Sequence, residues 1–126
     1  MPITPTARWL SIRHAARGVA VVFRTQHNAW LHAIATGVVL ATGFFVGLSR
    51  LEWCAIVLAM VAVWTAEALN TAIEIVVDLA SPDVHPLAGR AKDVAAGAVL
   101  ISACGAVVVG ILVFAPHLFG VPAAAR

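Results

Sequence analysis

The chain has 126 residues, of which 62% are hydrophobic and 11% are charged, and its formal net charge is +2. A soluble domain averages about 45–50% apolar and about 25% charged residues. The composition therefore indicates an integral membrane protein, organised as a single domain over residues 1–126. The length leaves no room for a separate soluble catalytic domain, and the small net charge gives no reason to expect a nucleic-acid partner.

The first predicted element is an amphipathic helix over residues 6–25. At 100° per residue, Arg13, Arg17 and Arg24 fall within about 40° of each other, and apolar side chains cluster about a quarter turn away. This pattern predicts a helix that lies on the inner membrane surface with its apolar face down. A signal peptide is the alternative, but the apolar run 18–23 is short for one and Arg24 interrupts it.

Three further segments are apolar over the roughly 20 residues that a membrane-spanning helix needs. They cover residues 29–48, 53–79 and 94–119. The predicted fold is therefore an all-α membrane protein with an amphipathic N-terminal surface helix and three transmembrane helices. A tight hairpin at 49–52 joins the first two spans. A polar loop at 80–93, which contains Pro82, Pro86 and Gly89, joins the last two.

Lysine and arginine predict the orientation of the chain in the membrane, because these residues concentrate on the cytoplasmic side. Two of them, Arg50 and Arg126, fall on one side of the predicted spans. Six fall on the other side, namely Arg8, Arg13, Arg17, Arg24, Arg90 and Lys92. The N-terminus and the 80–93 loop are therefore predicted to be cytoplasmic and the C-terminus to face outward.

The second predicted span carries a polar stripe in its second half. Glu67, Asn70, Glu74 and Asp78 follow each other at i, i+3, i+7 and i+11, so they project from one helix face. Ionisable groups inside a bilayer are costly, and such a stripe is by default a functional site. The alternative is a helix that leaves the membrane with solvated acids at its end. That alternative suits Asp78 but not Glu67, which lies about 17 Å earlier along the axis.

The polar segment HPLAGRAKD at 85–93 follows this stripe, and together they form a plausible phosphoryl-transfer site. Carboxylates bind Mg²⁺, which bridges phosphate oxygens. The side chains of Lys92 and Arg90 can meet phosphate charge, and a further carboxylate can take the proton of an attacking hydroxyl. A proton or ion relay is the alternative, since intramembrane acids also mark ion paths, but a relay does not require the 85–93 segment.

The run EALNTAIEIVVDLASPDVHPLAGRAKDVAAGAVL, residues 67–100, resembles the signature of the small prokaryotic diacylglycerol kinase family, which includes the undecaprenol kinases. The matching pattern is E-x-x-N-x-x-x-E-x-x-x-D followed by H-x-x-x-G-x-A-K-D. The resemblance implies an ATP-dependent lipid kinase that uses Mg²⁺ and acts on undecaprenol or diacylglycerol. It also implies a homotrimer in the bacterial inner (plasma) membrane, with composite active sites at the cytoplasmic membrane interface. Segment 78–100 looks slightly more like the undecaprenol kinase branch.

The resemblance also implies roles for individual residues. Glu67 resembles the catalytic base, and Glu74 resembles the glutamate that binds the divalent ion of the nucleotide. The nucleotide-site residues implied in the same way are Asn70, Asp78, Asp83, His85, Gly89, Lys92, Asp93 and, by a looser match, His14.

Three of these residues have structural alternatives. Asn70 can instead form a hydrogen bond between helices. His85 can cap the turn beside Pro86. Asp93 can be the N-terminal cap of the third span, with its carboxylate at the positive end of the helix dipole.

One departure from the family pattern lies at the start of the first span. The family has there a glutamate that shares the metal, and the matching position in TQHNAWLHA is Gln26. A neutral amide is a weaker Mg²⁺ ligand than a carboxylate. Either Gln26 holds the metal together with water, or metal binding is weakened or altered. The substitution also leaves open, as an alternative function, a non-catalytic oligomeric membrane protein derived from the kinase fold. The nearby His27 and His32 fit an oxygen-preferring ion poorly and are predicted to be interfacial histidines beside Trp30.

Overall fold

The structure, a computed structural model, describes residues 5–120, and this part of the chain is all-α. Its four helices are α1 (Pro5–Thr25), α2 (His27–Val46), α3 (Arg50–Ala80) and α4 (Pro86–Leu118). Helices α2, α3 and α4 are each long and apolar enough to cross a membrane. The predicted fold class, a surface helix followed by three spanning helices, is confirmed.

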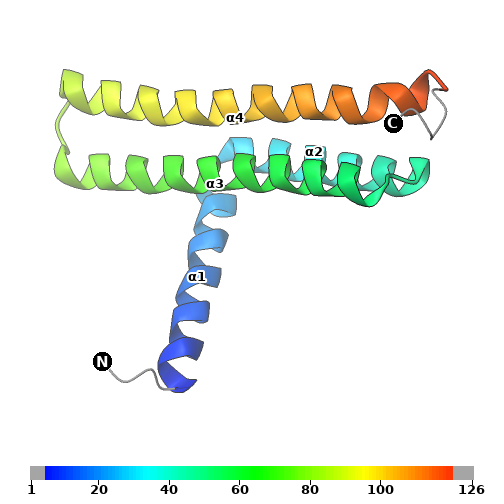
Figure 1. The fold of residues 1–126 in the computed structure, drawn as a ribbon. Coiled ribbons are helices and arrows are strands. Elements are labelled where there is room, and N and C mark those ends of the chain that lie inside the picture. Colours follow the sequence, from blue (N-terminus) through cyan, green and yellow to red (C-terminus); the bar gives the residue numbers. More distant parts are fainter. Residues whose placement is uncertain (1–4, 121–126) are drawn as a thin grey trace.

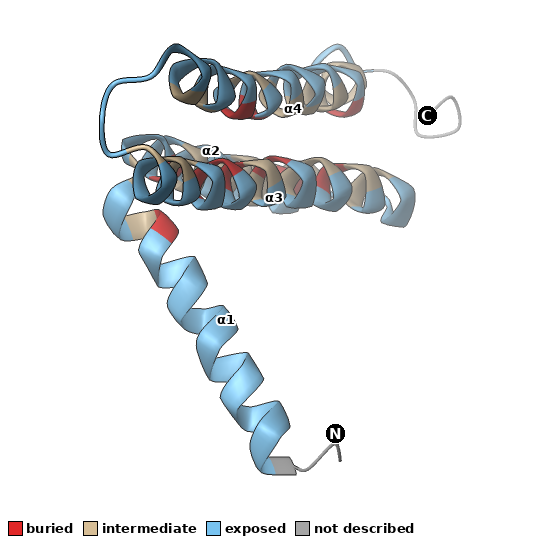
Figure 2. Cartoon of the chain, turned by 90° about the vertical axis from the view of Figure 1, so that its left-hand side faces the viewer, coloured by how far each residue is buried: buried red, intermediate tan, exposed pale blue. Residues whose placement is uncertain are grey.

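The three long helices run side by side, and α1 crosses them (Figure 1). α4 packs mainly against α3, and α2 packs more loosely on α3. α1 is exposed along nearly its whole length and contacts the bundle near its C-terminal end, where Val22 is buried (Figure 2). There the Phe23 ring lies 6.1 Å from Trp30 and 5.1 Å from Trp64. This crossing is the geometry that a helix on the membrane surface requires.

The connection between α2 and α3 is shorter than the predicted hairpin at 49–52. Gly47 ends α2 in the left-handed region, with φ of 72°, a conformation that glycine adopts without strain. Ser49 then begins α3 through a capping box, in which Ser49 Oγ accepts from the Glu52 N–H and Glu52 Oε2 accepts from the Ser49 N–H. Glu52 is therefore in the first turn of α3 and not in the connection.

The connection between α3 and α4 is also shorter than predicted, because α4 begins at Pro86 rather than at residue 94. His85 is the N-cap, and its Nδ1 accepts from the Leu87 N–H at 3.2 Å. Proline suits the first helical position, since its missing N–H needs no partner there. The alternative in which Asp93 caps this helix is therefore wrong, while the capping alternative for His85 is confirmed. Polarity alone did not mark the helix start.

The two ends of the bundle differ in what they bury. At the end near the α2–α3 connection, the core consists of Leu48, Ile56 and Val113. At the other end, the buried side chains on α3 are polar, namely Glu67, Asn70 and Thr71. Most large apolar side chains face outward, as expected for helices surrounded by lipid. The fold thus places its buried polar groups in one half of the bundle.

Candidate active site

A cleft of about 300 Å³ opens between α2, α3 and α4 at the polar end of the bundle. Glu67, Asn70 and Glu74 reach it from α3, and Gln26 reaches it from the N-cap of α2. The remaining lining residues are Asn28, Leu31, His32, Ala96, Val99, Leu100 and Ala103. Four residues singled out from the sequence are thus gathered in one cavity, although Gln26 and Glu74 are far apart along the chain.

Glu67 is the most unusual group in this cleft. Its side chain is 1% exposed, and neither carboxylate oxygen has a hydrogen-bond partner. The nearest basic group is His32, whose Nε2 lies 3.7 Å from Glu67 Oε2. Burying a polar group without hydrogen bonds costs several kcal/mol. A carboxylate kept in this state, facing a cavity, is expected at a site that receives a ligand rather than at one that stabilises the fold.

Glu74 is held by two amides. Its Oε1 accepts from Asn70 Nδ2 at 3.0 Å, and its Oε2 accepts from Gln26 Nε2 at 2.5 Å. Both are charge-assisted bonds, which are stronger than neutral ones. The structure therefore places Gln26 directly against the glutamate with which, by resemblance, it would share a metal ion.

The donor set around Glu74 fits Mg²⁺. Among residues 5–120 no group of three or more His, Cys, Asp or Glu side chains gathers as a metal site. Mg²⁺ does not require such a group, because it keeps several waters and binds through one or two carboxylates plus substrate phosphates. Glu74 supplies the carboxylate. Flipping the side-chain amide of Gln26 would present its oxygen to an ion beside Glu74. Asn70 Oδ1, which is buried without a partner, is a further oxygen donor.

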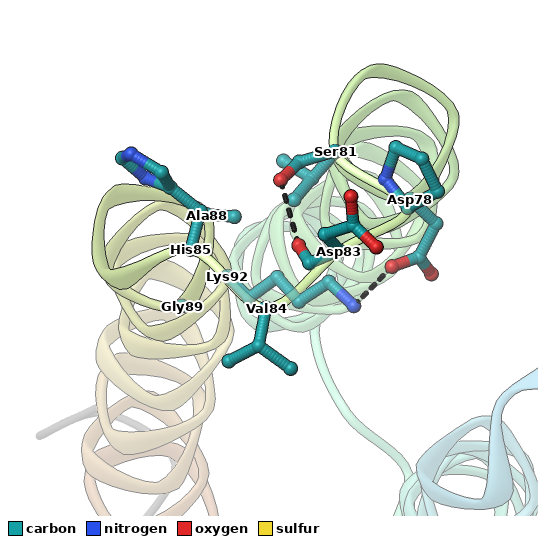
Figure 3. A pocket seen from close by; sticks show the side chains of 10 residues that line it. Asp78, Ser81, Asp83, Val84, His85, Ala88, Gly89 and Lys92 are labelled. Atoms are coloured by element: carbon teal, nitrogen blue, oxygen red, sulfur yellow. Dashed lines mark hydrogen bonds and ion pairs between the residues drawn. The ribbon is translucent and has the colours of Figure 1, made fainter.

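A second cavity, of about 240 Å³, lies at the end of α3 and the start of α4. Its lining includes five residues singled out from the sequence, namely Asp78, Asp83, His85, Gly89 and Lys92. Figure 3 shows Lys92 reaching across from α4 to Asp78 on α3, with Nζ 2.5 Å from Oδ1. Asp78 lies about 6 Å, roughly one turn, beyond Glu74 on α3, so lining residues of the two cavities follow each other along the same helix.

Gly89 leaves the wall of this second cavity open. A Cβ at this position would meet no atom within 4 Å, so packing within the chain does not require glycine there. The Gly89 N–H already donates to the His85 carbonyl at 3.2 Å. What glycine adds is room for a ligand to approach the backbone of α4 closely.

Two of the site residues predicted from the sequence lie outside both cavities, and two residues that line the cleft were not among those predicted. Asp93 is exposed on α4, and His14 is exposed on α1 away from the bundle, and neither lines a cavity. Asn28 and His32 line the cleft, although His32 was expected to be interfacial. Their spacing of i, i+4 in an otherwise apolar helix was the available signal, because such a pair shares one face.

The contact between Lys92 and Asp78 gives a prediction about nucleotide binding. Their side chains are 39% and 66% exposed, so the ion pair contributes little to stability. We expect Lys92→Ala to raise the KM for ATP about tenfold, the loss of one charge-assisted contact to phosphate, with little change in Tm. Arg90→Ala is the matched control, since Arg90 is exposed on the same turn and does not line the cavity. An unchanged KM in Lys92→Ala would remove the lysine from the nucleotide site.

Comparison with known proteins identifies the family of the chain. The prokaryotic diacylglycerol kinase family profile matches residues 13–114, which include both cavities. The chain is 46% identical over 108 residues to the undecaprenol kinase of Bacillus subtilis (strain 168), covering 86% of this chain and 88% of that protein. It is 39% identical over 110 residues to a Synechocystis diacylglycerol kinase, covering 86% of this chain and 63% of the relative. A Haemophilus influenzae diacylglycerol kinase is 32% identical over 110 residues, covering 82% and 90% of the two chains. The extent of these matches, together with the three candidate spans, makes the chain a member of the prokaryotic diacylglycerol kinase family of membrane lipid kinases.

Proposed function

We propose that this lipid kinase transfers the γ-phosphoryl group of ATP to undecaprenol, with Glu67 as the base. The observation that carries the site assignment is the buried Glu67 carboxylate, which has no hydrogen-bond partner and faces a cleft. A group in that state is available to accept a proton from a hydroxyl that enters the cleft. The 46% identity to a protein named undecaprenol kinase favours undecaprenol over diacylglycerol.

The stripe on α3 divides the reaction into three tasks. The second cavity, with Lys92 and Gly89, holds the nucleotide. Glu74 lies between this cavity and Glu67. Along the axis of α3 it is about 6 Å from Asp78 and about 10 Å from Glu67. Glu74 and Gln26 would hold Mg²⁺, which neutralises charge on the phosphates. Glu67 takes the hydroxyl proton as the oxygen attacks. The residues supply positioning and charge, which is what phosphoryl transfer requires of a protein.

Three further assignments belong to the same proposal. The N-terminus and the α3–α4 connection face the cytoplasm, where ATP is available, and the distribution of lysine and arginine supports this orientation. The protein acts as a homotrimer. Open space beside Gly97 and Gly105 on α4 supports close helix contacts with another copy. Residues 1–126 act as one lipid-kinase domain.

A lipid phosphorylation assay in mixed micelles tests the substrate. The purified protein is given ATP and Mg²⁺ with either undecaprenol or diacylglycerol, and the phosphorylated lipid is measured. We expect a higher kcat/KM for undecaprenol. A preference for diacylglycerol would show that the proposed lipid substrate is wrong and that the kinase activity is right. Proton conduction that needs no ATP, without lipid phosphorylation, would favour the relay alternative.

Gln26 provides a test of the metal assignment. If Gln26 and Glu74 share the ion, a carboxylate at position 26 adds Coulomb attraction and a better ligand. We therefore expect activity that needs unusually high Mg²⁺ and a Gln26→Glu variant that needs less. The measurement is lipid phosphorylation against Mg²⁺ concentration for both proteins. An unchanged Mg²⁺ midpoint, or loss of activity in Gln26→Glu, would show that position 26 does not hold the metal.

A further inference from the structure

His32 lies at the boundary between the polar cleft and an apolar cavity. It lines the cleft that contains Glu67 and also a neighbouring cavity of about 160 Å³. The other residues of that cavity are almost all apolar, namely Ala35, Thr36, Val39, Met60, Val63, Trp64, Ala103 and Val107. The imidazole Nε2 is therefore near the carboxylate, and the neighbouring cavity suits hydrocarbon. A lipid alcohol has this same division between a hydroxyl and an apolar chain.

The His32 ring is held in place by an aromatic neighbour. Its centroid lies 6.3 Å from that of Trp64 at an interplanar angle of 69°, an edge-to-face contact. Trp64 is itself fixed, because its Nε1 donates to Thr36 Oγ1 at 3.1 Å. The His32 side chain is 20% exposed. A ring restrained in this way is suited to hold a ligand atom in a defined position.

The distance between His32 and Glu67 is that of two groups that can share one oxygen atom between them. His32 Nε2 and Glu67 Oε2 are 3.7 Å apart, too far for a hydrogen bond between them. An oxygen atom can lie at a hydrogen-bond distance of about 2.8 Å from both atoms at once, because the two atoms are only 3.7 Å apart. We propose that this is the position of the lipid hydroxyl, and that His32 is a second catalytic residue that donates a hydrogen bond from Nε2 to that oxygen. The proposal rests on the lipid kinase function proposed above.

In the reaction, His32 orients the hydroxyl and Glu67 takes its proton. The hydroxyl oxygen forms a bond to the γ-phosphorus, and the bond from that phosphorus to the bridging oxygen breaks, with its electron pair leaving on ADP. The hydroxyl O–H bond breaks, and the proton passes to Glu67 Oε2. His32 keeps its own proton throughout. The donated hydrogen bond fixes one lone pair of the oxygen, so that another can point at phosphorus.

The test compares variants at position 32 that keep or lose a donor. His32→Leu and His32→Met lack a donor, whereas His32→Gln retains one. We expect the first two to lower kcat about 10²-fold, the loss associated with a misplaced reacting group, without changing the KM for ATP. His32→Gln is expected to stay within about tenfold of the unchanged protein. His27→Leu is the matched control, because His27 is exposed on the same helix and lines neither cavity.

A double variant separates a catalytic role from a structural one. If His32 and Glu67 act on the same oxygen, the double variant should have a kcat much less than tenfold below that of Glu67→Gln alone. The reason is that the effects of residues that act as a unit are not additive. A structural defect would instead multiply the two losses.

Each result decides the proposal. If the protein without substitutions phosphorylates no lipid alcohol, both the proposed function and this inference are wrong. An active protein whose His32→Leu and His32→Met variants keep their kcat overturns the role of His32 alone. The same follows if folded His32→Gln is as slow as His32→Leu. If neither donor-less variant folds, His32 is a packing residue and the proposal fails.

Discussion

Glu67→Gln is expected to lower kcat by about 10²–10⁴-fold, the contribution of a positioned general base. The amide has nearly the same shape as the carboxylate but cannot take the hydroxyl proton. The fold should not suffer, because the Glu67 carboxylate is 1% exposed and has no hydrogen-bond partner that the change would remove. A neutral amide is also less costly to bury than a carboxylate. We therefore expect unchanged or higher Tm together with unchanged ATP binding.

Lipid phosphorylation kinetics and thermal unfolding of the two proteins check this result. Glu52→Gln is the control, since it also removes a carboxylate from α3 but at the opposite end of the helix, where Glu52 Oε1 lies 2.9 Å from His117 Nε2. Its kcat should be close to that of the unchanged protein. Near-normal turnover in Glu67→Gln would exclude Glu67 as the base and leave the buried carboxylate without a role in the mechanism.

Glu74→Ala is expected to abolish metal-dependent ATP binding. Glu74 is the one carboxylate within hydrogen-bond distance of both Gln26 and Asn70 among residues 5–120, and its loss leaves only neutral oxygen donors around the proposed metal position. Neutral donors bind a hard dication far more weakly than a carboxylate does. Two amides would also lose their acceptor in a half-buried position, so a lower Tm is expected as well.

Nucleotide binding by titration calorimetry, with and without Mg²⁺, measures the effect of Glu74→Ala. Glu74→Gln is the second variant, because it keeps the acceptor oxygen for one amide and so separates loss of charge from loss of packing. Both variants should lose the Mg²⁺-dependent part of ATP binding. If both bind MgATP as the unchanged protein does, the metal position lies elsewhere and the division of tasks along α3 is wrong.

The helix boundaries illustrate where sequence reasoning was insufficient. The stretch 80–93 was predicted to be a loop because of its polarity and its prolines, yet α4 begins at Pro86. Local capping decided this start, since His85 accepts from the Leu87 N–H and proline at the first helical position costs nothing. A long spanning helix can carry polar residues on the turns that extend beyond the lipid, so polarity is a weak signal for its end.

The class of the protein and the helix face shared by its polar residues could be predicted from the sequence alone. Composition specified a membrane protein, and the helical spacing placed Glu67, Asn70 and Glu74 on one face of a helix, because the helical period depends only on local geometry. The order of the spans and the family resemblance likewise needed no coordinates. What the sequence could not determine is which other helices face this stripe.

The contact partners of each carboxylate depend on the packing of the helices and could not be predicted from the sequence. The tertiary structure brought Gln26 against Glu74 across 48 sequence positions and placed His32 3.7 Å from Glu67, while it left Asp93 and His14 outside both cavities. The physical reason is that in a bilayer the apolar pattern does not tell one helix face from another, because lipid and neighbouring helices are equally apolar. Rotation and register of α2 against α3 depend on side-chain packing, which is a property of the assembled bundle.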